Sequence, residues 1–93
     1  MADVTTGVEV RFFAAAVDAA GGREKDTVEL PAGADLGALR AALVDRYGPD
    51  MDRVLTVAAF LLDPGEGGTG ELTRDLGRPA GSRVDVLPPF AGG

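Results

Sequence analysis

Three short segments in which apolar residues alternate with polar or charged ones constrain most strongly how this chain can fold. They are residues 8–12 (VEVRF), 26–30 (DTVEL) and 83–87 (RVDVL). A period of two residues is typical of a strand that buries one face and exposes the other. Each segment is therefore predicted to be a half-buried β-strand, and Pro31 is expected to end the second one because proline cannot donate to a sheet ladder.

The alternation also divides the side chains of these strands between two faces. In the first strand, Val8, Val10 and Phe12 are predicted to face the core. By the same parity, Phe13 and Leu87 are predicted to lie on the outward face of the sheet.

An exposed apolar patch is expected on that outward face. Phe13 and Leu87 would form it with Phe90, and Phe60 is a further candidate. The alternative is a curled sheet with a loop over these side chains. Arg11 and Arg83 fall on the same face and are interpreted as solvated surface charge, with acids of a partner as the alternative contact.

One amphipathic helix is predicted over residues 36–47. Asp35 is a good N-cap, because its carboxylate can accept hydrogen bonds from the backbone of the first turn. Gly48 and Pro49 follow the helix, and this pair favours its termination. The apolar stripe has spacings of three, four and four residues and consists of Leu36, Leu39, Leu43 and Tyr47.

The remaining segments give weaker patterns. Residues 14–20 are rich in alanine and predict a short helical turn. The continuous apolar run of residues 54–62 is interpreted as a central strand. Residues 63–70 form a glycine-rich loop without the Gly-Lys-Ser/Thr ending of a phosphate-binding loop, and residues 71–76 predict a short turn of helix. The outline is an α+β domain with a small mixed sheet and one helix across it.

The composition excludes most forms of catalysis by this chain alone. It has no cysteine and no histidine, and therefore no thiolate metal site, no cysteine nucleophile and none of the commonest general base. Nine basic and fifteen acidic residues give a net charge of −6, which disfavours binding to nucleic acid. We therefore expect no enzyme activity of the chain by itself, no bound metal and no nucleic-acid partner.

The 93 residues suffice for one small domain. We expect a flexible N-terminus over residues 1–7, the folded domain over residues 8–87 and an extended tail over residues 88–93. No signal peptide is visible, and the longest apolar run is too short to span a membrane. A cytoplasmic protein that does not contact membranes is predicted.

The last six residues, Pro88-Pro89-Phe90-Ala91-Gly92-Gly93, are the most distinctive motif. The two prolines end the last strand and favour an extended course. Six extended residues reach about 20 Å, and the glycines add no side chains. Such a thin tail could pass its terminal carboxylate through a narrow channel into the active site of another protein.

Three parts of the sequence resemble the MoaD/ThiS-type sulfur carriers, which are bacterial β-grasp proteins related in fold to ubiquitin. Residues 8–14 (VEVRFFA) are similar to the family's first strand, and residues 30–36 (LPAGADL) to its run into the helix. Residues 88–93 match the Pro-Pro-x-x-Gly-Gly ending of the MoaD branch, the small subunit of molybdopterin synthase. The resemblance implies a β-grasp fold, with a mixed sheet of four to five strands and one main helix packed across it.

The resemblance also implies chemistry at Gly93. In the family, a MoeB/ThiF-type adenylyltransferase uses ATP and Mg²⁺ to convert the terminal carboxylate to an acyl-adenylate. A sulfur donor then leaves a thiocarboxylate, which is a ready nucleophile. In the MoaD branch the tail enters a MoaE-type large subunit, where the sulfur passes to a pterin precursor of the molybdenum cofactor. ATP and Mg²⁺ would be bound by the activating enzyme, and this chain would bind no cofactor.

By this resemblance the residues of the tail have distinct roles. Gly93 would be the site of adenylation and thiocarboxylation, and Gly92 its slim approach. The residues expected to contact the partner proteins are Phe13, Leu87, Pro88, Pro89, Phe90 and Ala91.

The segment after Phe60-Leu61-Leu62 departs from the family, because the long Asp63–Gly70 loop replaces a Val-Asn-Gly-like turn. Three alternatives therefore remain. The chain could supply sulfur for thiamine, cysteine or a specialised metabolite. It could be a protein modifier that joins Gly93 to target lysines, in which case Lys25, expected in a loop, is its only side-chain amine. It could also be a ubiquitin-like docking module without chemistry at the terminus.

Overall fold

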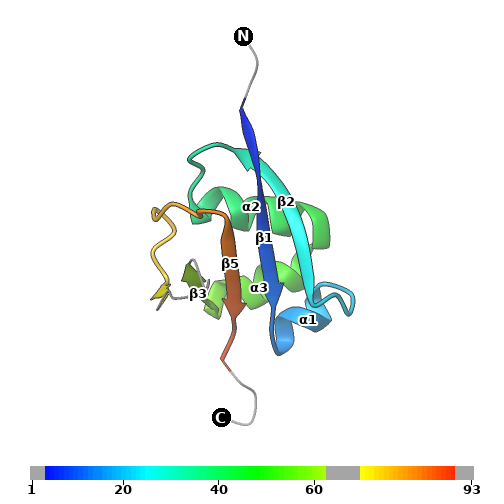
Figure 1. The fold of residues 1–93 in the computed structure, drawn as a ribbon. Helices are drawn as coiled ribbons and strands as arrows, with labels where there is room; N and C mark the ends of the chain where they lie inside the picture. The colour runs from blue at the N-terminus through cyan, green and yellow to red at the C-terminus, as the bar shows by residue number, and fades with distance from the viewer. Residues whose placement is uncertain (1–3, 63–69, 90–93) are drawn as a thin grey trace.

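The computed structural model describes residues 4–62 and 70–89, which form one five-stranded sheet and three helices (Figure 1). The first strand and the last lie beside each other in the middle of the sheet, and the helices cover one face. In chain order the elements are β1 (Thr5–Phe12), α1 (Ala15–Ala19), β2 (Lys25–Pro31), α2 (Leu36–Tyr47), α3 (Pro49–Val57), β3 (Ala59–Leu62), β4 (Glu71–Thr73) and β5 (Arg83–Leu87).

The sheet is mixed, with the order β2-β1-β5-β3-β4. β1 and β5 run parallel, with Val10 opposite Val84, and the other neighbouring strands are antiparallel. A central parallel pair formed by the two ends of the chain, with α2 packed across the sheet, is the β-grasp arrangement. The predicted fold class is therefore confirmed.

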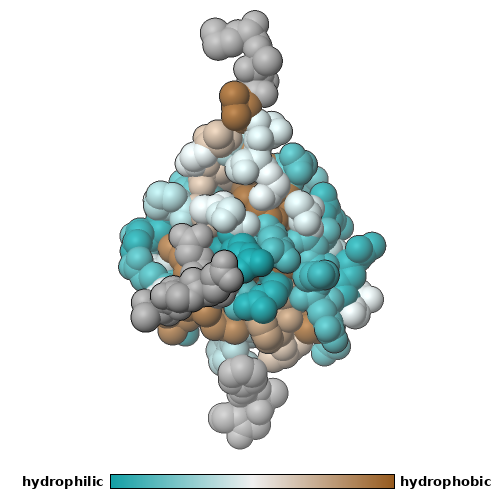
Figure 2. All heavy atoms as spheres, viewed as in Figure 1, coloured by the Kyte–Doolittle hydropathy of each residue, from teal (hydrophilic) through white to brown (hydrophobic). Residues whose placement is uncertain are grey.

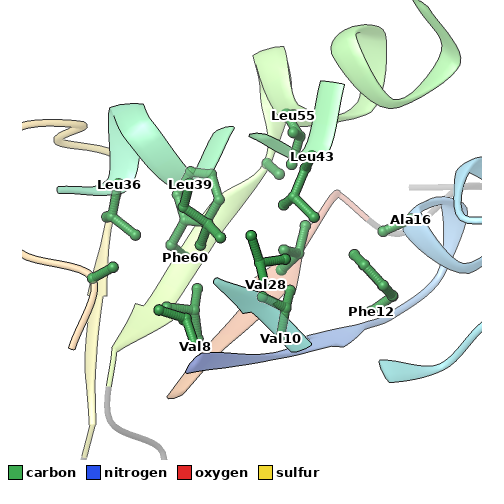
Figure 3. Packing of buried hydrophobic residues seen from close by; sticks show 14 of the residues in the cluster. Val8, Val10, Phe12, Ala16, Val28, Leu36, Leu39, Leu43, Leu55 and Phe60 are labelled. Atoms are coloured by element: carbon green, nitrogen blue, oxygen red, sulfur yellow. The ribbon is translucent and has the colours of Figure 1, made fainter. Parts of the chain in front are cut away.

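The core lies between the sheet and the helices. The alternation of β1 places Val8 and Val10 against it, as predicted, and both are fully buried. Figure 3 shows the apolar stripe of α2 above side chains from the strands, with Phe60 of β3 beside Leu39. The α2 residues that form this buried layer are Leu36, Leu39 and Leu43.

The ends of α2 follow the predicted capping. The Asp35 carboxylate accepts a hydrogen bond from the backbone N–H of Ala38 at 2.9 Å. At the other end Gly48 has a φ of 89°, a conformation that glycine adopts without a steric penalty. The bounds of this helix are those predicted from the sequence.

A hydrogen-bonded cluster ties the end of α2 to β2. The Asp26 carboxylate accepts from Arg46 at 2.7 Å and from the Tyr47 hydroxyl. Burial alone would raise the pKa of Asp26, but the hydrogen bonds from Tyr47 and Arg46 outweigh it, and this pKa lies below its usual value. Burial, followed by the bond to Asp26, raises the pKa of Tyr47. The Tyr47 ring also packs edge-on against Phe12, with 5.8 Å between ring centroids.

The prediction of a central strand over residues 54–62 is wrong for its first half. Residues 49–57 form α3, and only residues 59–62 form a strand. Pro49 occupies the first turn of α3, where its missing N–H is not needed. Met51 and Leu55, four residues apart, are the buried face of this helix, so its buried positions recur with a helical period.

Three other boundaries differ from the sequence-based expectation. β1 begins at Thr5, so residues 5–7 are not a loose tail but pair with residues 29–31 of β2. Residues 71–73 form β4 at the edge of the sheet and not a helical turn. Lys25 is the first residue of β2 and not part of a loop. These segments join the sheet through backbone pairing, which leaves little trace in a polar sequence. The predicted turn at residues 14–20 is confirmed as α1.

Among the residues that the structure describes, no helix is long and apolar enough to cross a membrane.

Candidate functional site

The outward face of the sheet, opposite the helices, carries paired charges on its two central strands. Arg11 of β1 lies beside Asp85 of β5 in the parallel register. Its Nε and Nη2 atoms each donate to one carboxylate oxygen of Asp85 at 2.7 Å. In the next row, Arg83 Nε donates to Glu9 Oε1 at 3.1 Å. Figure 2 views this face and shows hydrophilic residues across its middle.

These pairs differ from the expectation for Arg11 and Arg83. Both arginines lie on the outward face, as predicted, but their partners are acids of the same sheet. Asp85 is only 4% exposed, and both of its carboxylate oxygens accept hydrogen bonds from the half-exposed Arg11 side chain. The hydrogen bond and charge of Asp85 raise the pKa of Arg11 above its usual value. The pair therefore joins β1 to β5 through side chains in addition to their backbone pairing.

Apolar side chains surround this charged row. Phe13 and Leu87 are half-buried outward residues at the ends of the two central strands. The Arg11 guanidinium carbon lies 5.7 Å from the centre of the Phe13 ring, a cation–π distance. Figure 2 shows hydrophobic atoms gathered below the hydrophilic band, toward the end of the face where β1 and β5 finish in Figure 1.

Two further apolar residues belong to this face and were not predicted. Leu61 of β3 is opposite Asp85 on one side and Leu72 of β4 on the other. Leu72 is 62% exposed. The sequence pattern does not indicate them, because residues 57–62 are all apolar and residues 71–76 do not alternate clearly. We use the term outer patch for Phe13, Leu61, Leu72 and Leu87.

Phe60 does not belong to the outer patch. It is 1% exposed and packs in the core against α2 (Figure 3). Its neighbour Leu61 points the other way, because successive residues of a strand face opposite sides. The proposed role of Phe60 in an exposed patch is therefore wrong.

The carboxyl end of β5 leads directly into the proline pair. Pro88 is buried and Pro89 is exposed. Pro88 is thus part of the body of the domain, which leaves less of it for a partner than expected. The other predicted tail residues, Phe90, Ala91, Gly92 and Gly93, lie outside the described residues, as do residues 63–69 of the glycine-rich loop.

The turn from β1 into α1 contains an unusual backbone conformation. Ala14 has a φ of 54° and a ψ of −129°, and it is the one non-glycine residue with positive φ in the described part of the chain. Such a conformation costs on the order of 1–3 kcal/mol for a residue with a side chain. It directly follows Phe13 and sets the direction in which the chain leaves the outer patch.

The chain offers no obvious metal centre in the part that the structure describes. Within residues 4–62 and 70–89, no three histidine, cysteine, aspartate or glutamate side chains come together as they would around a metal ion. The acidic side chains near the outer patch are instead engaged with arginines.

Comparisons with known proteins support the fold. No protein-family model matches the sequence, and no curated protein matches it. Among solved structures, the chain is similar to the HVO 2177 protein of Haloferax volcanii, whose structure was determined in solution. The two share a TM-score of 0.68 and 23% sequence identity, over 96% of this chain and 88% of that one. At this identity the likeness shows the fold alone.

Proposed function

We propose that this protein is a sulfur carrier of the MoaD/ThiS type, in which the carboxylate of Gly93 is the chemical site. The observation that carries the proposal is the position of β5. This central strand ends in Pro88-Pro89, and the sequence then continues through Phe90 and Ala91 to Gly92 and Gly93. A strand held on both sides is a firm base for a terminal segment that another protein must grip and thread.

The chemistry needs little from the carrier itself. A carboxylate oxygen of Gly93 attacks the α-phosphorus of ATP on a MoeB/ThiF-type adenylyltransferase, and pyrophosphate leaves with Mg²⁺ support from that enzyme. Hydrosulfide then adds to the carbonyl carbon, and AMP leaves. The product is a thiocarboxylate, which reacts as a nucleophile without an adjacent base. A chain without histidine or cysteine is suited to this role.

The outer patch supports a role in docking. It lies on the face of the sheet opposite the helices, and Leu87 directly precedes the proline pair with which the tail begins. A partner that covered Phe13 and Leu87 would contact the domain beside the point where the tail begins. The outer patch lies beside the ion pairs Arg11–Asp85 and Glu9–Arg83, and protein interfaces combine apolar side chains with charged and polar groups in this way.

The resemblance of the Pro-Pro-Phe-Ala-Gly-Gly ending to the MoaD branch favours a role as the small subunit of molybdopterin synthase, with a MoaE-type large subunit as the second partner. The pterin precursor would then receive the sulfur. Delivery of sulfur to thiamine, cysteine or a specialised metabolite would use the same terminal thiocarboxylate. Attachment of Gly93 to lysines of other proteins would share only the activation of the terminal carboxylate and would then form an isopeptide bond.

Exchange of labelled pyrophosphate into ATP tests the first step. The full chain, a MoeB/ThiF-type enzyme and ATP with Mg²⁺ should give exchange that depends on the chain. A variant with one alanine added after Gly93 should give none, because the added side chain blocks the narrow approach. The variant Arg74→Ala, altered far from the tail in sequence, is the matched control. Exchange with the extended chain at the rate of the unaltered one would overturn the proposal.

A further inference from the structure

A second surface lies on the side of Phe13 that faces away from β5. A shallow groove of about 760 Å³ lies where β1 leads into α1 and where β2 begins. Its lining includes Arg11, Phe13, Val17, Arg23, Glu24 and Lys25. The backbone N–H of Phe12 donates to the Glu24 carbonyl at 2.9 Å, so the two walls of the groove are joined at its base.

The cations of the groove stand out against the rest of the chain. Among the described residues, six of the nine basic side chains form ion pairs. The three that form none within those residues are Arg23, Lys25 and Arg74, and the first two line this groove. A protein with a net charge of −6 thus presents, on one small surface, two cations that form no ion pair among the described residues, together with one acid, Glu24.

The pairing of β1 with β2 places two positive charges of the groove directly opposite each other, which lowers the stability of the fold when no ligand is bound. Lys25 of β2 is directly opposite Arg11 of β1 in the antiparallel pairing. Like charges in directly opposed positions destabilise a sheet, and Asp85 balances only Arg11. The acid that lines the groove beside Lys25 is Glu24. A ligand with negative charge would relieve this repulsion.

An apolar contact lies beside the cations. Phe13 is half-buried and Val17 of α1 is partly buried against the core, so both are held in place while the groove stays open. The positive φ of Ala14 between them turns the chain so that both side chains line the same groove. Backbone strain of this kind is concentrated where a local geometry is needed for binding.

We propose that this groove binds an acidic segment of a protein partner, with an apolar side chain of that segment on Phe13 and its carboxylates beside Arg23 and Lys25. A protein segment is favoured over nucleic acid, because the groove offers only Arg23 and Lys25 outside the ion pairs of the described residues, too few cations for an extended polyphosphate. It is favoured over a small inorganic anion, because the apolar side chains of Phe13 and Val17 line the groove beside the cations. This inference does not depend on the chemistry at Gly93.

Titration of the ¹⁵N-labelled full chain with short peptides tests the proposal. The probe is the hexapeptide Glu-Glu-Phe-Leu-Glu-Glu, and the comparison peptides are Gln-Gln-Phe-Leu-Gln-Gln and Lys-Lys-Phe-Leu-Lys-Lys. The acidic peptide should shift the amide signals of residues 13–17 and 23–25 and few others. The glutamine peptide should bind more weakly, and the lysine peptide should not shift these signals.

Charge-reversal variants then distinguish binding in the groove from a general effect of the net charge of the protein. Arg23→Glu and Lys25→Glu should each weaken binding of the acidic peptide by about fivefold or more. Arg74→Glu changes the net charge by the same amount and removes the third unpaired cation, which lines a different groove, and should change binding less than about twofold. The amide spectrum of each variant shows whether it is folded.

Three results would overturn the proposal. The acidic peptide could leave residues 13–17 and 23–25 unshifted, or all three charge reversals could weaken it equally. A single-stranded oligonucleotide could produce the same shifts at a lower concentration than the peptide, which would assign the groove to nucleic acid.

Discussion

Arg11 and Asp85, which are 74 residues apart in the sequence, form a two-pronged ion pair across the central strands of the sheet. The carboxylate is nearly inaccessible to water, whereas about half of the arginine side chain is exposed. The two partners therefore differ in what they lose when the pair is broken. Arg11 can return to solvent, but Asp85 cannot.

This asymmetry predicts unequal effects of substitution. Arg11→Met should lower the free energy of unfolding by about 2 kcal/mol, because it leaves a buried carboxylate without its partner. Asp85→Leu should cost clearly less, and the double variant should recover part of the loss. Urea denaturation of the three variants measures this. If Arg11→Met changes stability by less than about 0.5 kcal/mol, the pair does not hold β1 against β5.

Phe13 and Phe60 should respond in opposite ways, since one lies in the outer patch and the other in the core. Phe60→Ala should destabilise the domain by about 3–5 kcal/mol through the cavity that it leaves. Phe13→Asp should keep the domain folded and abolish binding of the activating enzyme. Thermal unfolding and a pull-down with that enzyme read out the two effects. Unfolding of Phe13→Asp would place Phe13 in the core.

Ala14→Gly should stabilise the protein, although a glycine normally destabilises. The positive φ of Ala14 is readily adopted by glycine, so releasing the strain should raise the free energy of unfolding by about 1 kcal/mol. The matched control is Ala15→Gly, one residue later in α1, which should lower it by up to about 1 kcal/mol. A loss of stability in both variants would show that the turn is not strained.

Tyr47→Phe should reduce stability by about 1 kcal/mol near neutral pH through loss of the hydrogen bond to Asp26. The lowered pKa of Asp26 gives stability that is present above the unfolded value near about pH 4 and is lost as the pH falls through the folded pKa. The raised pKa of Tyr47 gives stability that is present below about pH 10 and is lost as the pH rises through the folded pKa.

The difference between this variant and the unaltered protein should therefore be greatest between these limits and shrink on both sides. Chemical denaturation at a series of pH values measures it. Tyr47 is the only tyrosine of the chain, so a loss of stability caused by tyrosine ionisation at alkaline pH can be assigned to it. A difference that stays constant across the whole range would contradict the assigned hydrogen bond.

Elements with a clear period and clear caps could be predicted from the sequence. The bounds of α2 followed from Asp35, its leucine stripe and Gly48, and the inward residues of β1 followed from strict alternation. α3 could not be recognised in the same way, because apolar residues fill both its buried face and the strand after it. The signal for its start, Pro49 after Gly48, is at the same time the signal for the end of α2.

The candidate site was only partly predictable for a related reason. Parity placed Phe13, Leu87, Arg11 and Arg83 on the outward face correctly. The partners of the two arginines depend on which strands become neighbours, and that register is set by the packing of the whole sheet. The placement of Lys25 opposite Arg11 depends in the same way on the antiparallel pairing of β1 with β2. No local pattern could have revealed the groove between β1, α1 and β2.

The most direct test of the central claim is the intact mass of the chain. The protein is incubated with ATP, Mg²⁺, a MoeB/ThiF-type adenylyltransferase and a sulfide source, and the product is fragmented to locate any change. We predict a gain equal to the replacement of one oxygen by sulfur, confined to Gly93. An unchanged mass under conditions in which the same enzyme modifies its own carrier, or a gain on any other residue, would contradict the account.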